Sequence, residues 1–250
     1  MSLFSRKPTS AFFFDAPLEP DVPFYAIGDV HGCDMLLARL LVRLAEQTHP
    51  DAMLVCVGDY VDRGEQSAQV LQRLHRLSGE AGGNMICLKG NHEAMLLDFL
   101  DNPVESGPRW LRHGGLQTVA SYGLPLVPRT APDAEWRALR DRLRAALGED
   151  IERWLRDLQF WWKTGNVAVV HAGADPRQPM DGQMPETLLW GHPDFERMAR
   201  RDGVWIVHGH TIVSEAAPVR GRIPVDTGAY ATGRLTAVLV EAGKLTVIGI

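Results

Sequence analysis

Residues 24–32 read FYAIGDVHG, an apolar run that ends at a glycine and is followed at once by Asp29 and His31. Short apolar runs of this kind are typical of buried strands. The glycine permits the tight turn in which the chain leaves the strand. Four further segments have the same form: residues 53–64 (MLVCVGDYVDRG), 85–93 (MICLKGNHE), 167–173 (VAVVHAG) and 204–211 (VWIVHGHT).

Helical patterns separate the first three of these runs. Leucines and other apolar residues recur at helical spacing over residues 35–47, 67–77 and 93–100. Strands that alternate with helices indicate βαβ units, a largely parallel sheet and an α/β fold. In such sheets ligands bind beyond the carboxyl ends of the strands. We therefore expect the polar residues that end the five runs to converge on one rim.

The middle of the chain, about residues 101–163, has a different pattern. Pro103, Gly107 and Pro108 open it, and residues 133–158 have the pattern of an amphipathic helix broken near residues 148–150. We interpret this segment as a helical insertion or lid on a single domain that spans residues 1–250. Residues 235–240 and 245–250 are expected to close the fold as a hairpin.

The composition limits the class of protein. The net charge is −5, whereas general nucleic-acid binders usually carry a basic excess, so no nucleic-acid partner is expected. No stretch approaches the roughly 18 apolar residues of a membrane helix, and the apolar run at residues 11–14 is too short for a signal peptide. The expected protein is cytoplasmic and has no membrane partner.

The polar residues at the strand ends are of the types that bind metals. Carboxylates, imidazoles and an amide oxygen together suit manganese, iron or zinc. Two such ions, roughly 3.5–4 Å apart, form a clamp for displacement at phosphorus. A pair of ions needs a bridging ligand, and one carboxylate can supply it. The candidate ligands are Asp29, His31, Asp59, Asn91, His171 and His210.

The segments GDVHG, GDYVDRG and GNHE, in that order, resemble the signature of the serine/threonine phosphoprotein phosphatases, which are calcineurin-like metallophosphoesterases. The later HAG and GHT segments fit the same pattern, and residues 226–230 (DTGAY) resemble the small bacterial and bacteriophage type. The resemblance covers residues 25–240 and is weakest across the helical middle. It implies a βαβαβ core in a two-sheet sandwich, flanked by helices and carrying a helical insertion.

The resemblance also implies roles for the candidate ligands. Asp29 and His31 would hold a first divalent ion, and Asp59 would bridge it to a second. Manganese is the expected metal, with iron and zinc as alternatives. The second ion would be held by Asn91, His171 and His210.

By the same resemblance, a hydroxide shared by the two ions would attack phosphorus. His92 would protonate the leaving oxygen as general acid, and Asp62 would orient the His92 ring. Arg63 would grip the phosphate oxygens with its planar guanidinium. Tyr230 would line the substrate pocket.

The chain departs from the family at one position. Related phosphatases carry a second phosphate-binding arginine between the last two metal histidines, and in the small phage-type members it closely follows a tryptophan. Residues 189–193 here read LWGHP, so His192 occupies that place as a candidate substrate-binding residue. The arginines that might replace the missing one are Arg197, Arg200 and Arg220.

Three functions are compatible with these features. The first is hydrolysis of phosphate monoesters, above all phosphoserine and phosphothreonine in proteins, with phosphotyrosine as a further substrate. The second is hydrolysis of symmetrical dinucleoside polyphosphates, although the second motif of those enzymes typically lacks the residue that is Asp62 here. The third is an inactive phosphate-recognising scaffold. The expected partner is a phosphoprotein or a small phosphoester, and nothing in the sequence indicates an oligomeric state.

Overall fold

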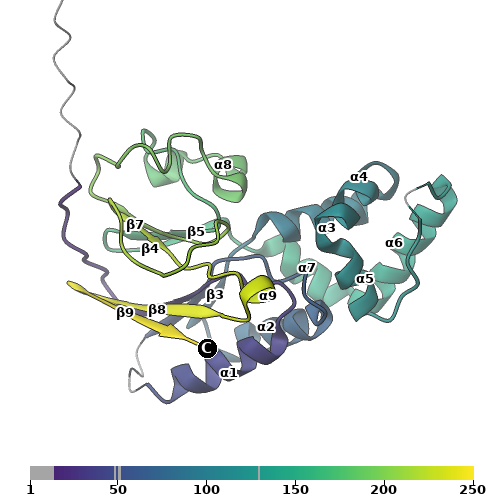
Figure 1. Cartoon of the computed structure of the whole chain (residues 1–250), viewed down its shortest axis with the longest axis horizontal. Coiled ribbons are helices and arrows are strands. Elements are labelled where there is room, and N and C mark those ends of the chain that lie inside the picture. Colours follow the sequence, from purple (N-terminus) through teal and green to yellow (C-terminus); the bar gives the residue numbers. More distant parts are fainter. Residues whose placement is uncertain (1–13, 48, 50–51, 129) are drawn as a thin grey trace, which may run out of the picture.

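The computed structural model describes residues 14–47, 49, 52–128 and 130–250. The apolar run at residues 11–14 therefore lies largely outside the described residues. Figure 1 shows two sheets lying face to face, with helices along the outer face of one and a cluster of helices at one end. No helix in the described ranges has the length and apolar content that crossing a membrane requires.

The first sheet has the strand order β3-β2-β1-β8-β9. β1, β2 and β3 are parallel, and β8 and β9 add antiparallel strands beside β1. Helices α1 and α2 make the connections between the parallel strands, which confirms the expected βαβαβ core. The elements are β1 (Phe24–Ile27), α1 (Asp34–Ala45), β2 (Met53–Cys56), α2 (Ser67–Glu80), β3 (Met85–Cys87), β8 (Thr236–Glu241) and β9 (Lys244–Gly249).

The second sheet has the order β4-β5-β6-β7, with β5, β6 and β7 parallel. The five apolar runs are therefore divided between two sheets and do not share one rim. β4 also corrects the predicted extent of the insertion, because Trp161 and Trp162 pair with β5 as a strand. The elements are β4 (Trp161–Thr164), β5 (Val167–Val170), β6 (Trp205–His208) and β7 (Arg222–Pro224), accompanied by η2 (Met180–Gly182), α8 (Pro185–Trp190) and α9 (Ala229–Thr232).

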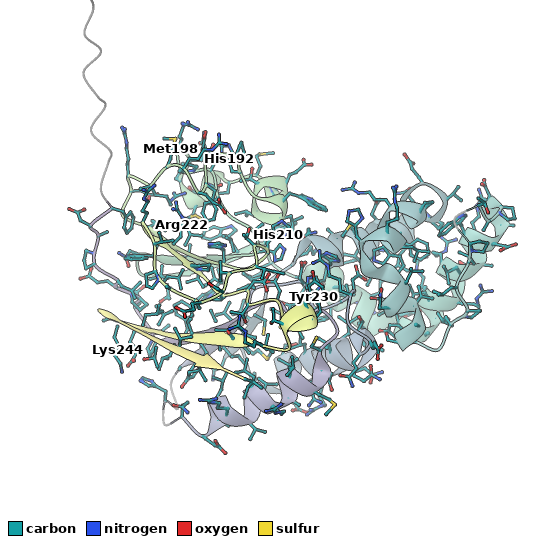
Figure 2. All side chains as sticks on the ribbon, viewed as in Figure 1. His192, Met198, His210, Arg222, Tyr230 and Lys244 are labelled. Carbon is teal, nitrogen blue, oxygen red and sulfur yellow. The ribbon has the colours of Figure 1, made fainter. Side chains whose placement is uncertain are left out.

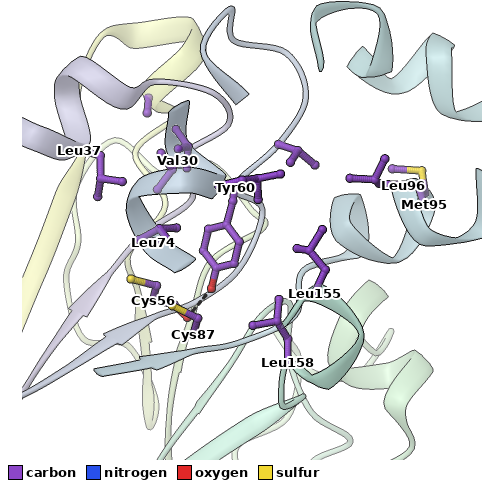
Figure 3. Close-up of a cluster of buried hydrophobic side chains, with 14 of the residues drawn as sticks. Val30, Leu37, Cys56, Tyr60, Leu74, Cys87, Met95, Leu96, Leu155 and Leu158 are labelled. Atoms are coloured by element: carbon purple, nitrogen blue, oxygen red, sulfur yellow. Dashed lines mark hydrogen bonds between the residues drawn. The ribbon is translucent and has the colours of Figure 1, made fainter. Parts of the chain in front are cut away.

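Both faces of β1 are buried, which explains why its sequence is apolar without alternation. Phe24 and Ala26 point into the layer between the two sheets, with Val55 and Val169. Tyr25 and Ile27 belong to the cluster on the opposite, helix-covered face. Figure 3 shows part of this second cluster around Tyr60, whose hydroxyl donates a hydrogen bond to the Cys56 carbonyl oxygen at 3.2 Å.

The helical insertion lies at the end of the sandwich, beyond the edges of the sheets (Figure 1). Trp110 and Trp136 are buried in it, and α6 and α7 meet at Gly148, as the broken helical pattern predicts. Helical structure ends at Asp157, six residues before the predicted boundary at Lys163. α3 (Asn91–Asp101) follows β3 and leads into the insertion, whose elements are α4 (Pro103–Trp110), η1 (Leu111–Gly115), α5 (Leu116–Ser121), α6 (Asp133–Leu147) and α7 (Glu149–Asp157).

Candidate metal centre

The predicted metal ligands come together where the carboxyl ends of β1, β2 and β3 approach those of β5 and β6. Figure 2 labels His210 at this junction, and the ring of Tyr230, in α9, lies 5.2 Å from that of His31 between centroids. His210 is partly exposed, whereas the other five candidate ligands are buried. The sequence predicted the meeting of these side chains, and both sheets of the sandwich that the resemblance implies supply them.

Asp59 stands at the centre of the cluster, and its two carboxylate oxygens face different histidines. Oδ2 lies 3.3 Å from His31 Nε2. Oδ1 lies 3.3 Å from His171 Nε2. A carboxylate that presents one oxygen to each side has the geometry of a bridging ligand. The arrangement agrees with the bridging role that the resemblance implies.

Two sets of side chains around Asp59 have potential ligand atoms within 4.8 Å of one another. One set is His31, Asp59 and His92, and the other is Asp59, His171 and His210. Asn91 joins the second set, because its Oδ1 lies 2.8 Å from His171 Nε2 and 3.0 Å from His210 Nδ1. The second set thus contains all the predicted ligands of the second ion.

Asp29, the other predicted ligand of the first ion, lies in the same buried cluster but outside both sets. Its carboxylate accepts a hydrogen bond from the backbone N–H of His210, at 3.0 Å to Oδ2. Burial and the neighbouring carboxylates of Asp226 and Asp59 raise the pKa of Asp29 well above its ordinary value. In the first set it is His92, at 3.9 Å from Asp59 Oδ2, that stands beside His31 and Asp59. An ion that binds Asp29 would relieve this repulsion between carboxylates.

The chemistry of the cluster fits divalent cations. Burial lowers the pKa of His31 to about 3 and that of His171 to about 4, so both imidazoles are neutral and keep the lone pair that a metal needs. Asp29, Asp59 and Glu93 bring buried carboxylates into the same region. Buried carboxylates are costly unless positive charge compensates them. Neutral imidazoles beside carboxylates form a donor set for divalent metals.

The backbone around the cluster is held in an unusual conformation. Non-glycine residues rarely adopt positive φ, which costs roughly 1–3 kcal/mol at each such position. Five of the six described non-glycine residues that do so belong to the predicted site. Such clustering is typical of functional sites. Their φ angles are 42° at His31, 53° at Asp59, 71° at Asp62, 67° at Arg63 and 64° at His210.

Glu93 is a site residue that the sequence analysis did not assign. Its side chain is fully buried and accepts hydrogen bonds from the backbone N–H groups of Asp59 at 2.8 Å and Tyr60 at 2.7 Å. It also accepts from Gly90 N–H at 2.9 Å. Glu93 therefore shapes the turn that presents Asp59. Its place at the third position of α3 is the available signal, because glutamate there commonly binds backbone N–H groups.

His92, Asp62, Arg63 and Tyr230 lie together beside the first set. His92 Nδ1 is 2.7 Å from Asp62 Oδ2, and Arg63 Nη2 is 3.2 Å from His92 Nε2. Arg63 Nη1 donates to the Tyr230 hydroxyl at 2.7 Å. Burial opposes a charge on His92, but Asp59 and Asp62 outweigh it and raise the His92 pKa. The ring is thus oriented by Asp62, with Nε2 on the side where Arg63 and Tyr230 lie.

His192 lines a cavity of about 420 Å³ that borders the second set at His210. Trp190 and Arg197 line the same cavity. Arg200, by contrast, is buried and pairs with Asp202. Of the arginines proposed to replace the missing one, Arg197 therefore shares a cavity with the predicted metal ligand His210.

Removing divalent ions is expected to lower the unfolding temperature, and adding Mn²⁺ should restore it. An ion that binds only the folded state stabilises it by about 2.7 kcal/mol at 100 times its dissociation constant. Thermal unfolding of chelator-treated protein with and without Mn²⁺ measures this effect. Equal unfolding temperatures over a Mn²⁺ titration to millimolar concentrations would contradict a metal centre.

Comparison with known proteins places the chain in a family. A sequence model described as calcineurin-like phosphoesterase matches residues 22–214. An asymmetrical bis(5'-nucleosyl)-tetraphosphatase from Oceanobacillus iheyensis is 30% identical over 234 residues, which cover 84% of this chain and 86% of that protein. A symmetrical bis(5'-nucleosyl)-tetraphosphatase from Pseudomonas fluorescens is 30% identical over 155 residues, covering 61% of this chain and 43% of that protein.

A solved structure shows the same fold. The cold-active protein-tyrosine phosphatase of a Shewanella species matches with a TM-score of 0.62 at 19% identity, over 90% of this chain and 77% of that one. The family match includes every predicted metal ligand, from Asp29 to His210. The chain is therefore a hydrolase of the metallophosphoesterase superfamily and belongs to the calcineurin-like phosphoesterase family.

Proposed function

We propose that this protein hydrolyses bis(5'-nucleosyl) tetraphosphates. The observation that carries the proposal is the similarity, over 84% of the chain, to an asymmetrical bis(5'-nucleosyl)-tetraphosphatase. The symmetrical relative covers less of the chain, 61%. We therefore infer an off-centre cut, which splits the substrate into a nucleoside triphosphate and a nucleoside monophosphate. Dinucleoside polyphosphates are the second of the substrate classes compatible with the sequence, after phosphoproteins.

The site has features that suit a polyphosphate chain. Divalent ions bound around Asp59 would neutralise phosphate oxygens and activate water for attack on phosphorus. Arg63, hydrogen-bonded to Tyr230, presents its guanidinium at one side of the cluster. The cavity that contains His192 and Arg197 opens at the other side, next to His210. A substrate with several phosphates carries negative charge that both sides of the cluster could bind.

A phosphomonoesterase that acts on phosphoproteins is the second candidate. The buried contact between His92 Nδ1 and Asp62 Oδ2, at 2.7 Å, favours it. A serine or threonine alkoxide is a poor leaving group and depends on a proton donor. A departing nucleotide phosphate is much less basic and needs that proton less.

A substrate comparison tests both candidates. Manganese-loaded protein is incubated with diadenosine tetraphosphate and, separately, with a phosphoserine peptide, and the products are separated by chromatography. We expect ATP and AMP as the products. Two molecules of ADP would instead show that the enzyme cuts the polyphosphate at its centre. Turnover of the peptide alone would establish the phosphoprotein candidate. Turnover of neither substrate with manganese bound would favour an inactive scaffold.

Replacing Arg197 with alanine is expected to raise KM for diadenosine tetraphosphate by about 10- to 100-fold. Arg197 lines the cavity that also contains His210, and a hydrogen bond to a charged group contributes about 1.5–3 kcal/mol. Steady-state kinetics with Arg220→Ala as the matched control measures the effect, because Arg220 is exposed and does not line this cavity. Equal KM values for the two variants would show that Arg197 does not bind the substrate.

A further inference from the structure

The helical insertion reaches into the candidate active site through two side chains. Trp110 ends α4 and Thr118 lies in α5, and both are buried. Both contact Asp62, the residue that orients His92. From the sequence, this segment is interpreted as a helical insertion or lid. The contacts with Asp62 indicate a different role for the insertion.

The carboxylate of Asp62 is surrounded by hydrogen-bond donors. Oδ1 accepts from the Thr118 hydroxyl at 2.6 Å, and the Trp110 indole N–H lies 3.1 Å from Oδ1 and 3.0 Å from Oδ2. Oδ2 also faces His92 Nδ1 at 2.7 Å. With Trp110 and Thr118 in place, the carboxylate cannot rotate without breaking hydrogen bonds in a fully buried place. The His92 ring is oriented in turn by that carboxylate.

The insertion also forms hydrogen bonds with the backbone of Asp62 and of the next residue, Arg63. Asp62 N–H donates to Thr118 Oγ1 at 2.9 Å, and Arg63 N–H donates to the Gly114 carbonyl oxygen at 3.2 Å. Asp62 and Arg63 have φ angles of 71° and 67°, which surrounding contacts must maintain. Gly114, at φ 109°, has no room for a side chain, because a Cβ would lie 2.7 Å from Arg63 N.

We propose that Trp110 and Thr118 are positioning residues that hold Asp62, and through it His92, in the orientation for proton donation. The inference rests on the role proposed for His92. In the reaction, the oxygen of water forms a bond to phosphorus and the bond to the leaving oxygen breaks. The leaving oxygen keeps the electron pair and takes a proton from His92 Nε2. The attacking water gives up a proton to solvent, from which His92 is reprotonated.

The test removes the hydroxyl that binds Asp62 without changing the shape of the side chain. Thr118→Val is compared with Thr118→Ser, which keeps the hydroxyl. Phenyl phosphate has a basic leaving group that needs a proton, whereas p-nitrophenyl phosphate does not. We expect Thr118→Val to lower kcat on phenyl phosphate by about tenfold, a fraction of the 10²- to 10⁴-fold that general acid catalysis supplies. The loss on p-nitrophenyl phosphate should be smaller, and Thr118→Ser should restore kcat.

Trp110→Phe should give the same pattern, because it removes the indole N–H and keeps an aromatic ring. Its matched control is Trp136→Phe, since Trp136 is equally buried in the insertion but lies against Gly107. Equal losses on the two substrates in Thr118→Val and Trp110→Phe would assign these residues a structural role only and overturn the inference.

A double variant separates this inference from the role of His92. In a His92→Asn background, Thr118→Val should cost nothing further, because residues that act through one group are not additive. If Thr118→Val lowers kcat in the His92→Asn background as much as it does in the wild-type protein, the inference is overturned. If His92→Asn itself shows no dependence on the leaving group, the proposed role of His92 fails instead, and the inference falls with it. Neither result depends on hydrolysis of a dinucleoside tetraphosphate.

Discussion

Replacing His92 with asparagine is expected to lower kcat by about 10²- to 10⁴-fold on substrates with a basic leaving group, the range for a general acid. The ring is held by Asp62 at 2.7 Å through Nδ1, and its Nε2 lies 3.2 Å from Arg63 Nη2. Asparagine is of similar polarity but has no titratable proton. The kcat of the variant on phenyl phosphate, compared with that of the wild-type protein, measures the loss.

The metal content of the same variant is the decisive control. If His92 is the proton donor, the ion content per chain should stay at the wild-type value when it is measured by elemental analysis. The structure makes this a strict test, because His92 Nε2 lies only 3.9 Å from Asp59 Oδ2, within the first set. Loss of one ion would show that His92 is a metal ligand. Loss of both ions would contradict its assigned position beside the metals.

Replacing Asp59 with asparagine is expected to weaken the binding of both ions and abolish turnover. Each oxygen of Asp59 lies 3.3 Å from a histidine of a different set. An amide has one oxygen and no charge, so it cannot serve both ions as a carboxylate does. We expect the apparent affinity for each ion to fall by at least the 10- to 100-fold that even the loss of an outer-shell partner costs. Calorimetric titration of chelator-treated protein with Mn²⁺ measures this change.

Asp34→Asn is the matched control for Asp59→Asn. Asp34 is a buried carboxylate at the start of α1, and its Oδ1 accepts a hydrogen bond from Arg73 Nε at 2.7 Å. Removing its charge should alter stability and leave the ion content unchanged. Unaltered Mn²⁺ affinity in Asp59→Asn would rule out the bridge.

Much of the first sheet could be predicted because its signals are local. An apolar run followed by glycine marks the end of β1 at Ile27, and the observed strand ends there. The leucine spacing that predicts a helix over residues 67–77 matches α2, which begins at Ser67. β7 could not be predicted in this way. It is only three residues long and contains Arg222 and Pro224, so its existence depends on pairing with β6.

The predicted boundary of the insertion was wrong for a related reason. Trp161 and Trp162 follow an amphipathic helix and contain no turn signal of their own. They form β4 because Val169 and Val170 lie opposite them in the neighbouring strand. A strand at the edge of a sheet is specified by its partner more than by its own sequence.

The candidate site residues could be predicted from the sequence, because each candidate ligand lies shortly after a strand in a recognisable motif. The motifs and their order along the chain were sufficient to predict the fold and the family. Tertiary structure alone decided that Glu93 shapes the Asp59 turn and that the cavity beside His210 contains Arg197. It also decided that Trp110 and Thr118 hold Asp62. The contacts of Trp110 and Thr118 with Asp62 join residues 48 and 56 positions apart, and no local pattern encodes such a contact.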